Sequence, residues 1–143
     1  MEVSQQWIRM TFAILAVVLL SIPWYLANNA EYIRPVSTGK VVHIVDGDTL
    51  DITGIGRVRL VGVNTPEKDE EGYQEALDFL ETSCLGREVE VDIDDESPED
   101  GYGRILGVVY VEGTNINAQL LRLGYAEILY LPPSEFDPVL WLN

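Results

Sequence analysis

Cysteine, histidine and lysine are scarce in this chain of 143 residues, and each shortage narrows the chemistry that the protein can use. Cys84 is the single cysteine, so no intramolecular disulfide can form, and its place in a helical pattern indicates a small buried hydrophobe. His43 is the single histidine and alternates with apolar neighbours in VVHIV, as an ordinary strand residue does. Catalysis by a histidine general base and histidine-rich zinc sites are therefore not expected.

Positive charge is also in short supply. The chain has 24 acidic and 9 basic residues, a formal net charge of −15, and only two of its basic residues are lysines. Such a surface repels nucleic acid in dilute salt. Strong acidity with little lysine favours adaptation to molar salt, where the Debye length is about 3 Å and charge repulsion is mostly screened. The alternative is an ordinary acidic extracellular domain.

The longest hydrophobic run lies near the N-terminus. Residues Met10 to Ala27 are almost wholly apolar, and these 18 residues reach the minimum length for a helix that spans a membrane. Arg9 before this run favours a cytoplasmic N-terminus, and Trp7, Trp24 and Tyr25 fit the two membrane interfaces. A cleaved secretory signal is the rival interpretation, although a good small-x-small cleavage site is missing. A buried helix of a soluble protein is the third.

These observations divide the chain into three parts. We expect an N-terminal membrane anchor or signal segment over residues 1–30, a linker over 31–38 and one domain over 39–143. An uncleaved anchor would place the domain outside the cytoplasm at the cell membrane, and cleavage would release it as a secreted protein. We expect a monomer, and no protein partner can be read from the sequence.

Hydrophobic periodicity and turn residues predict the elements of the domain. The expected helix after residue 72 has Leu77, Leu80 and Cys84 on one face, and the tail after Leu131 is expected to fold back through Phe136, Leu140 and Trp141. The expected strands are Lys40–Val45, Thr49–Thr53, Arg57–Val63, Arg87–Asp94 and the central Arg104–Val111; the expected helices are Tyr73–Leu85 and Asn115–Leu123, with an extended Ala126–Leu131.

This order of elements, β-β-β-α-β-β-α, matches a five-stranded Greek-key barrel of the OB type. The fold class is therefore α+β, mainly β, with two to three helices in the domain and one transmembrane or signal helix before it. The sequence DGD is expected to form the tight turn between the first two strands, since a glycine between two aspartates suits a hairpin.

Four polar residues within the first three strands carry the chemistry. Asp46 and Asp48 flank the glycine of DGD, Arg59 lies in RVRL, and Glu67 ends NTPE. Carboxylates hold a hard cation, an arginine binds an anion, and a further carboxylate can orient water. Together they are the components of metal-assisted hydrolysis of a phosphodiester.

Three motifs, in order, give the chain a resemblance to a known family. VDGDTL, RVRLVGVNTPE and DGYGR, with the looser NINAQLLRLGYAEI, resemble the staphylococcal nuclease-like (thermonuclease) domain over about Lys40 to Leu131. The first three motifs together are specific, whereas any one of them alone is weak. The resemblance covers nearly all of the chain beyond the N-terminal segment.

The resemblance implies a role for each matching residue. Asp48 would be a direct calcium ligand, Asp46 an outer carboxylate and Thr65 a backbone-carbonyl ligand. Arg59 would hold a phosphate oxygen, and Glu67 would act as general base or orient the attacking water. Arg104 would stabilise the developing charge and assist the leaving group, Tyr102 would donate a hydrogen bond to a phosphate, and Tyr130 would offer its ring to a base.

The chain departs from the family pattern in the metal site and in its loops. Asn64 stands where a metal-binding aspartate is expected; its oxygen can still bind calcium but brings no charge. The loop after Glu67 is short and acidic where the family often has a lysine-rich one, and residues 94–100 add more acid. The family's last helix is absent or reduced to a short turn.

We expect a nuclease that hydrolyses DNA with a divalent metal, calcium by resemblance, with another metal and an RNA substrate left open. Its partners would be nucleic acid and, through the N-terminal helix, a membrane. The alternative is a catalytically weak OB-fold module of the cell envelope that binds nucleic acid or cations. Retention of Arg59, Glu67 and Arg104 argues for the enzyme, because a binding module has no need of all three.

Overall fold

The computed structural model describes residues 36–142. The expected anchor or signal segment lies outside these residues. Within residues 36–142, no helix combines the length and the apolar character needed to cross a membrane. The strands are β1 (Ser37–Asp46), β2 (Thr49–Ile52), β3 (Gly56–Leu60), β4 (Gly62–Asn64), β5 (Glu88–Ile93), β6 (Ile105–Val111), β7 (Thr114–Asn115) and β8 (Glu127–Leu129). The helices are α2 (Tyr73–Cys84), α3 (Ile116–Arg122) and the 3₁₀ helix η1 (Pro138–Leu142).

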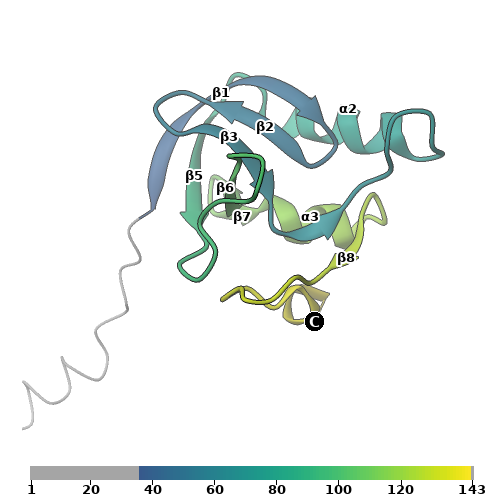
Figure 1. Ribbon diagram of the computed structural model, residues 1–143. Helices are drawn as coiled ribbons and strands as arrows, with labels where there is room; N and C mark the ends of the chain where they lie inside the picture. Colours follow the sequence, from purple (N-terminus) through teal and green to yellow (C-terminus); the bar gives the residue numbers. More distant parts are fainter. Residues whose placement is uncertain (1–35, 143) are drawn as a thin grey trace, which may run out of the picture. The chain divides into compact units, whose positions relative to one another are not determined.

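Five strands close into a barrel. The hydrogen-bonded order is β3-β2-β1-β5-β6, and a parallel pairing of β3 with β6 closes the ring. The two α-helices lie outside this ring, and β4 pairs with β8 in a separate two-stranded sheet (Figure 1). The fold is the five-stranded α+β barrel that the sequence predicted, and it is consistent with an OB-fold.

The core fills the barrel with branched aliphatic side chains. Alternate residues of each strand point inward, as the two-residue period of a strand requires. The inward side chains of β6 and its neighbours β3 and β5 are buried, and Leu80 and Cys84 of α2 and Leu120 of α3 pack against them. Burial raises the pKa of the Cys84 thiol to about 12, so this cysteine is the inert hydrophobe that we expected.

The DGD turn joins β1 to β2 as predicted, with Asp46 paired to Thr49 across it. Only glycine fits between the two aspartates. A Cβ atom at Gly47 would lie 2.7 Å from both Ala76 Cβ and Thr65 Oγ1, which is far inside van der Waals contact. The turn is therefore pressed between α2 and the segment that follows β4.

The third expected strand, Arg57–Val63, is wrong as a single element. It ends at Leu60, and a new strand, β4, begins at Gly62 with a φ of +78°. The ring of Trp141 lies about 2.9 Å from where a Cβ of Gly62 would be. Glycine allows both the bend and the close packing, so the chain can leave the barrel and pair with β8.

Smaller differences follow from local contacts. β1 begins at Ser37, three residues before the expected start, because residues 37–40 pair with β5. The buried face of α2 is Ala76, Leu80 and Cys84, with Leu77 only partly buried beside it. α3 begins one residue later than predicted because Asn115 caps it, accepting a hydrogen bond from the Ala118 N–H at 2.8 Å.

The C-terminal tail covers the β4 side of the domain. As predicted, Phe136 is buried and Trp141 packs on the core. Their ring centroids lie 6.5 Å apart. The expectation for Leu140 is wrong, because 67% of its surface is exposed. Within η1, Trp141 turns toward Gly62, and Leu140, one residue earlier, projects outward. The carbonyl of Trp141 also accepts a 2.7 Å hydrogen bond from Arg122, which ties η1 to α3.

His43 is an ordinary strand residue, as expected, and belongs to a surface cluster on the outside of β1, β2 and β3. Asp51 accepts two hydrogen bonds from Arg57, at 2.8 and 3.0 Å, and contacts His43 Nδ1 at 3.1 Å. The hydrogen bonds from Arg57 lower the pKa of Asp51 to about 2.

Replacement of Arg57 by alanine should return the Asp51 carboxyl toward its ordinary pKa of about 3.9. Because the folded-state pKa of Asp51 lies below that value, the contact stabilises the fold above about pH 4 and is lost as the pH falls through about 2. A carboxyl NMR titration of both proteins measures this. An Asp51 pKa that is the same in both would contradict the assignment.

Candidate active site

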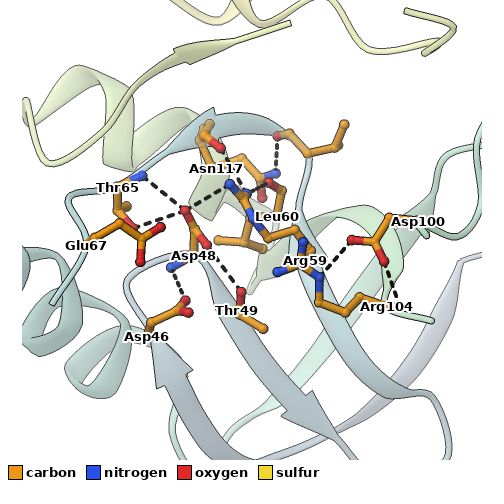
Figure 2. A network of polar contacts seen from close by, with 12 residues as sticks. Asp46, Asp48, Thr49, Arg59, Leu60, Thr65, Glu67, Asp100, Arg104 and Asn117 are labelled. Carbon is orange, nitrogen blue, oxygen red and sulfur yellow. Dashed lines mark hydrogen bonds and ion pairs between the residues drawn. The ribbon is translucent and has the colours of Figure 1, made fainter. Parts of the chain in front are cut away.

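The buried carboxylate of Asp48 is the centre of a polar network at the open side of the DGD turn (Figure 2). Its Oδ2 accepts hydrogen bonds from the Thr65 backbone N–H and hydroxyl, both at 3.0 Å, and forms an ion pair with Arg59 Nη2, also at 3.0 Å. Its Oδ1 accepts one hydrogen bond, from the Thr49 hydroxyl at 3.2 Å. Burial raises the pKa of Asp48, and Arg59 and Thr65 oppose this shift.

Arg59 is as enclosed as its partner, with only 11% of its side chain exposed. Its Nη1 donates to the carbonyl of Leu60 and, at 2.9 Å, to the carbonyl of Val63. Burial lowers the pKa of Arg59, and Asp48 opposes that shift. The guanidinium is therefore fixed at both terminal nitrogens. Nη1 donates to two carbonyls of the β3–β4 bend, and Nη2 pairs with the Asp48 carboxylate of the DGD turn.

Arg104 directly precedes β6, the strand that pairs with the Arg59 strand β3, and it lines the same pocket as Arg59. Its Nε donates to Asp100 Oδ2 at 2.7 Å, and the other oxygen of Asp100 accepts the backbone N–H groups of Tyr102 and Arg104 at 2.9 and 3.1 Å. Burial acts to raise the pKa of Asp100, but these hydrogen bonds together lower it. Asp100 thus orients Arg104 and leaves the terminal nitrogens of its guanidinium free of that contact.

The remaining acids lie beside this pair of arginines. Asp46 is half-buried and accepts the Asp48 backbone N–H at 3.1 Å, whereas the Glu67 side chain is exposed. The charges of Asp46, Glu67 and Arg104 all act on the pKa of Arg59, which places the four groups in one electrostatic site. From left to right in Figure 2, the labelled side chains are Glu67, Asp48, Arg59 and Arg104.

The two tyrosines named from the sequence are available to a ligand. Tyr102 is 87% exposed, and the guanidinium of Arg104 lies 5.3 Å from its ring centroid. Tyr130 is 48% exposed and follows β8; its neighbours Leu129 and Leu131 line a pocket of about 140 Å³ that both arginines also line. The ring of Tyr102 therefore lies against Arg104, whereas Tyr130 lies between two chain neighbours that line the pocket.

A metal would find oxygen donors here but few charges. Asn64 is exposed at the end of β4 and, with Thr65, lines a groove of about 760 Å³. Within residues 36–142, no three His, Cys, Asp or Glu side chains are arranged to hold a metal ion. The possible donors are the carboxylates of Asp48 and Asp46 and the neutral oxygens of Asn64 and Thr65. Oδ1 of Asp48 accepts only one hydrogen bond, from Thr49. This all-oxygen set fits a hard divalent cation, held weakly because Asn64 adds no charge.

Two supporting residues were missed by the sequence reasoning. Thr49 and Asp100 lie inside the quoted motifs, in VDGDTL and DGYGR, but no role was assigned to either. The structure shows that Thr49 donates to Asp48 and that Asp100 fixes Arg104. An aspartate four residues before an arginine in a glycine-rich turn was the available signal, because the turn can bring the pair into contact.

A family profile described as "Staphylococcal nuclease homologue" matches residues 57–138, more than half of the chain. An uncharacterized endonuclease of Escherichia coli is 35% identical over 106 residues, which are 71% of this chain and 66% of that protein. The thermonuclease of Staphylococcus intermedius is 33% identical over 104 residues, 66% of this chain and 61% of that protein. The micrococcal nuclease of Shigella flexneri is 37% identical over 100 residues, 62% of this chain and 56% of that protein.

The chain spans only about half to two thirds of the length of the curated relatives it matches first. The similarity therefore concerns the barrel domain. It includes the β3 to Glu67 segment and the Asp100–Arg104 turn, which supply both arginines of the site.

Substitution of Asp100 by asparagine should release the Arg104 guanidinium while the barrel stays folded. The asparagine keeps an oxygen that accepts the Tyr102 and Arg104 backbone N–H groups, whereas its NH₂ group cannot accept from Arg104 Nε. We expect a protected Arg104 Nε–H signal in the NMR spectrum of the wild type and its loss to solvent exchange in D100N. The matched control is D95N, which removes an exposed acid from the same loop and should leave the signal in place. Equal loss in both variants would show that loop charge, not orientation by Asp100, protects Arg104.

Proposed function

The chain belongs to the staphylococcal nuclease homologue family, and on that premise we propose that it is a phosphodiesterase that cleaves DNA with the help of a divalent cation. The observation that carries the proposal is the pair of arginines, Arg59 and Arg104, brought to one site with the carboxylates of Asp48, Asp46 and Glu67. Two fixed guanidinium groups beside acids that can hold a cation suit a phosphodiester, whose charge grows during hydrolysis.

The chain's own residues divide the work. Arg59, already fixed to the carbonyls of Leu60 and Val63, binds a phosphate oxygen with its remaining donors. Arg104, oriented by Asp100, stabilises the charge that develops as the leaving oxygen departs. The exposed carboxylate of Glu67 accepts the proton of an attacking water or orients it.

A cation would be held by Asp48 and Asp46, with the oxygens of Thr65 and Asn64 completing the set. When bound, it would supply Lewis-acid stabilisation of the same phosphate. Calcium fits a site made only of oxygens, and the family likeness supports it. With one carboxylate fewer than the family pattern, the site should bind calcium weakly and tolerate other hard divalent cations.

Two exposed tyrosine rings, of which that of Tyr102 lies beside Arg104, support a nucleic-acid substrate. Tyr102 and Tyr130 can stack on bases or donate to phosphates, which no small phosphodiester would need. No described contact distinguishes DNA from RNA, so RNA is included as a second substrate.

A direct test uses the full chain in detergent, in about 1 M salt with calcium, and follows the breakdown of single-stranded and duplex DNA. The variant Glu67→Gln should lower kcat about 10²- to 10⁴-fold, because it removes the proton acceptor and leaves the shape unchanged. Arg104→Lys should also cleave more slowly than the wild type, since an ammonium group cannot reproduce the planar, forked hydrogen bonding of a guanidinium. Chelation of the metal should abolish cleavage reversibly.

The control for lost positive charge is Arg87→Ala, an exposed arginine before β5, which should cleave at the wild-type rate. A folded, metal-loaded wild type that cleaves nothing would refute the enzyme. If it still binds DNA or calcium, the second candidate holds, a catalytically weak binding module. Asn64 favours this second candidate, because an asparagine brings no charge to the metal site.

The acidic groove next to Thr65 supports our proposal that the protein works in concentrated salt. Glu70, Glu71, Glu75 and Glu127 line it, on the side of the site that also holds Asn64. At low salt these carboxylates repel DNA over about 10 Å, and at about 1 M over only about 3 Å. Screening would therefore let a polyanion approach the two arginines.

Conversion of Glu70, Glu71 and Glu75 to glutamine should lower KM for DNA several-fold at about 0.1 M salt and have little effect at about 1 M. The comparison variant converts Glu81, Glu88 and Glu90, which removes the same charge from exposed positions outside the groove. KM measured across salt concentrations decides the matter. Identical salt curves for both triple variants would mean that net charge alone, and not the groove, governs the approach of DNA.

A further inference from the structure

Asn117 is a fully buried polar residue of α3 and has no part in the site described so far. All of its hydrogen-bonding capacity is directed at backbone. Its Oδ1 accepts the N–H of Val109 at 3.1 Å, and its Nδ2 donates to the carbonyl of Val61 at 2.8 Å and to that of Gly107 at 3.2 Å. One amide thus joins α3 to β6 and to the bend between β3 and β4.

The bend that Asn117 holds is the same bend that holds Arg59. The two carbonyls that accept from Arg59 Nη1 belong to Leu60 and Val63, on either side of Val61. Val61 itself is fixed at both ends of its backbone, because its N–H donates to Gly107 at 3.0 Å and its carbonyl accepts from Asn117. Figure 2 shows Asn117 in one network with Leu60 and Arg59.

We propose that Asn117 is a positioning residue for Arg59, acting through the β3–β4 bend. The bend lies outside the regular barrel pairing, since β3 ends at Leu60 and β4 pairs with β8. Without the Val61 contact, the bend keeps the hydrogen bond from the Val61 N–H to Gly107 and the pairing of β4 with β8, but it loses its tie to α3. The Leu60 and Val63 carbonyls are then held less firmly. The guanidinium would then keep its ion pair with Asp48 but lose its fixed orientation toward a phosphate.

Asparagine is the side chain whose chemistry and length match this place. It offers one acceptor and two donors at the end of a short stem, and here it uses all three in a site with no exposed surface. An ionised aspartate cannot donate, a leucine leaves buried backbone groups without partners, and a glutamine is one methylene longer. The amide of Asn117 therefore orients the backbone of Val61, Gly107 and Val109, which an apolar side chain packed in the same place could not do.

The test uses the full chain in detergent and rests, for its kinetic arm, on the proposed nuclease function. Asn117→Ser keeps a small polar group, but its side chain is too short to make the three hydrogen bonds of the amide. In the wild type, the Arg59 guanidinium protons should give slowly exchanging NMR signals, because Nη1 donates to two carbonyls. In N117S these signals should broaden or vanish, while kcat falls at least ten-fold and KM changes little.

The matched control is Leu120→Ala, which opens a cavity at a fully buried position of the same helix. It should lower stability and leave the Arg59 signals and the kcat of the folded protein near wild type. If N117S does not fold, hydrogen exchange of the Asn117 side-chain NH₂ protons in the wild type replaces it, because they donate to the carbonyls of Val61 and Gly107. Slow exchange of both protons supports the proposal, and rapid exchange of the proton directed at Val61 overturns it.

The two proposals fail in different ways. If N117S and L120A keep the same Arg59 signals and the same kcat, Asn117 is merely structural and the positioning role is refuted. If the wild type cleaves no nucleic acid but N117S alone loses the Arg59 signals, the positioning role stands and the nuclease function falls.

Discussion

The contact that the rest of the site depends on is the buried ion pair between Asp48 and Arg59. A carboxylate and a guanidinium that are both removed from water are costly unless other hydrogen bonds satisfy them. Thr49 and Thr65 donate to the carboxylate, and the carbonyls of Leu60 and Val63 accept from the guanidinium. These bonds draw the DGD turn, the β3–β4 bend and the segment before Glu67 into one place.

The bend after Leu60 links the fold to the chemistry. A strand that continued straight would keep residues 62–64 in the barrel and carry Thr65 away from Asp48. The chain instead turns at Gly62, where only glycine leaves room for Trp141. The C-terminal tail and α3 therefore support the bend, which leads the chain to Asn64, Thr65 and Glu67 of the site.

The sequence predicted much of this molecule for identifiable reasons. Strand alternation and glycine turns located the five barrel strands, and the DGD hairpin formed as expected because its pattern is local. The motifs named the residues around Asp48 that the structure brings together. The split of Arg57–Val63 was missed because apolar residues continue past Leu60 and a single glycine, Gly62, did not signal a break. The close packing at Gly62 comes from Trp141, about 80 residues further along the chain.

The sequence by itself determined the barrel order, the family and the residue types of the site, since these follow from periodicity and from motifs of neighbouring residues. Only the tertiary structure decided how the two arginines are held. Asp100 lies four residues from Arg104 and could be foreseen, but Asn117 holds the carbonyl of Val61 from 56 positions away. Such a contact depends on how a helix docks against a bend, which no local pattern encodes.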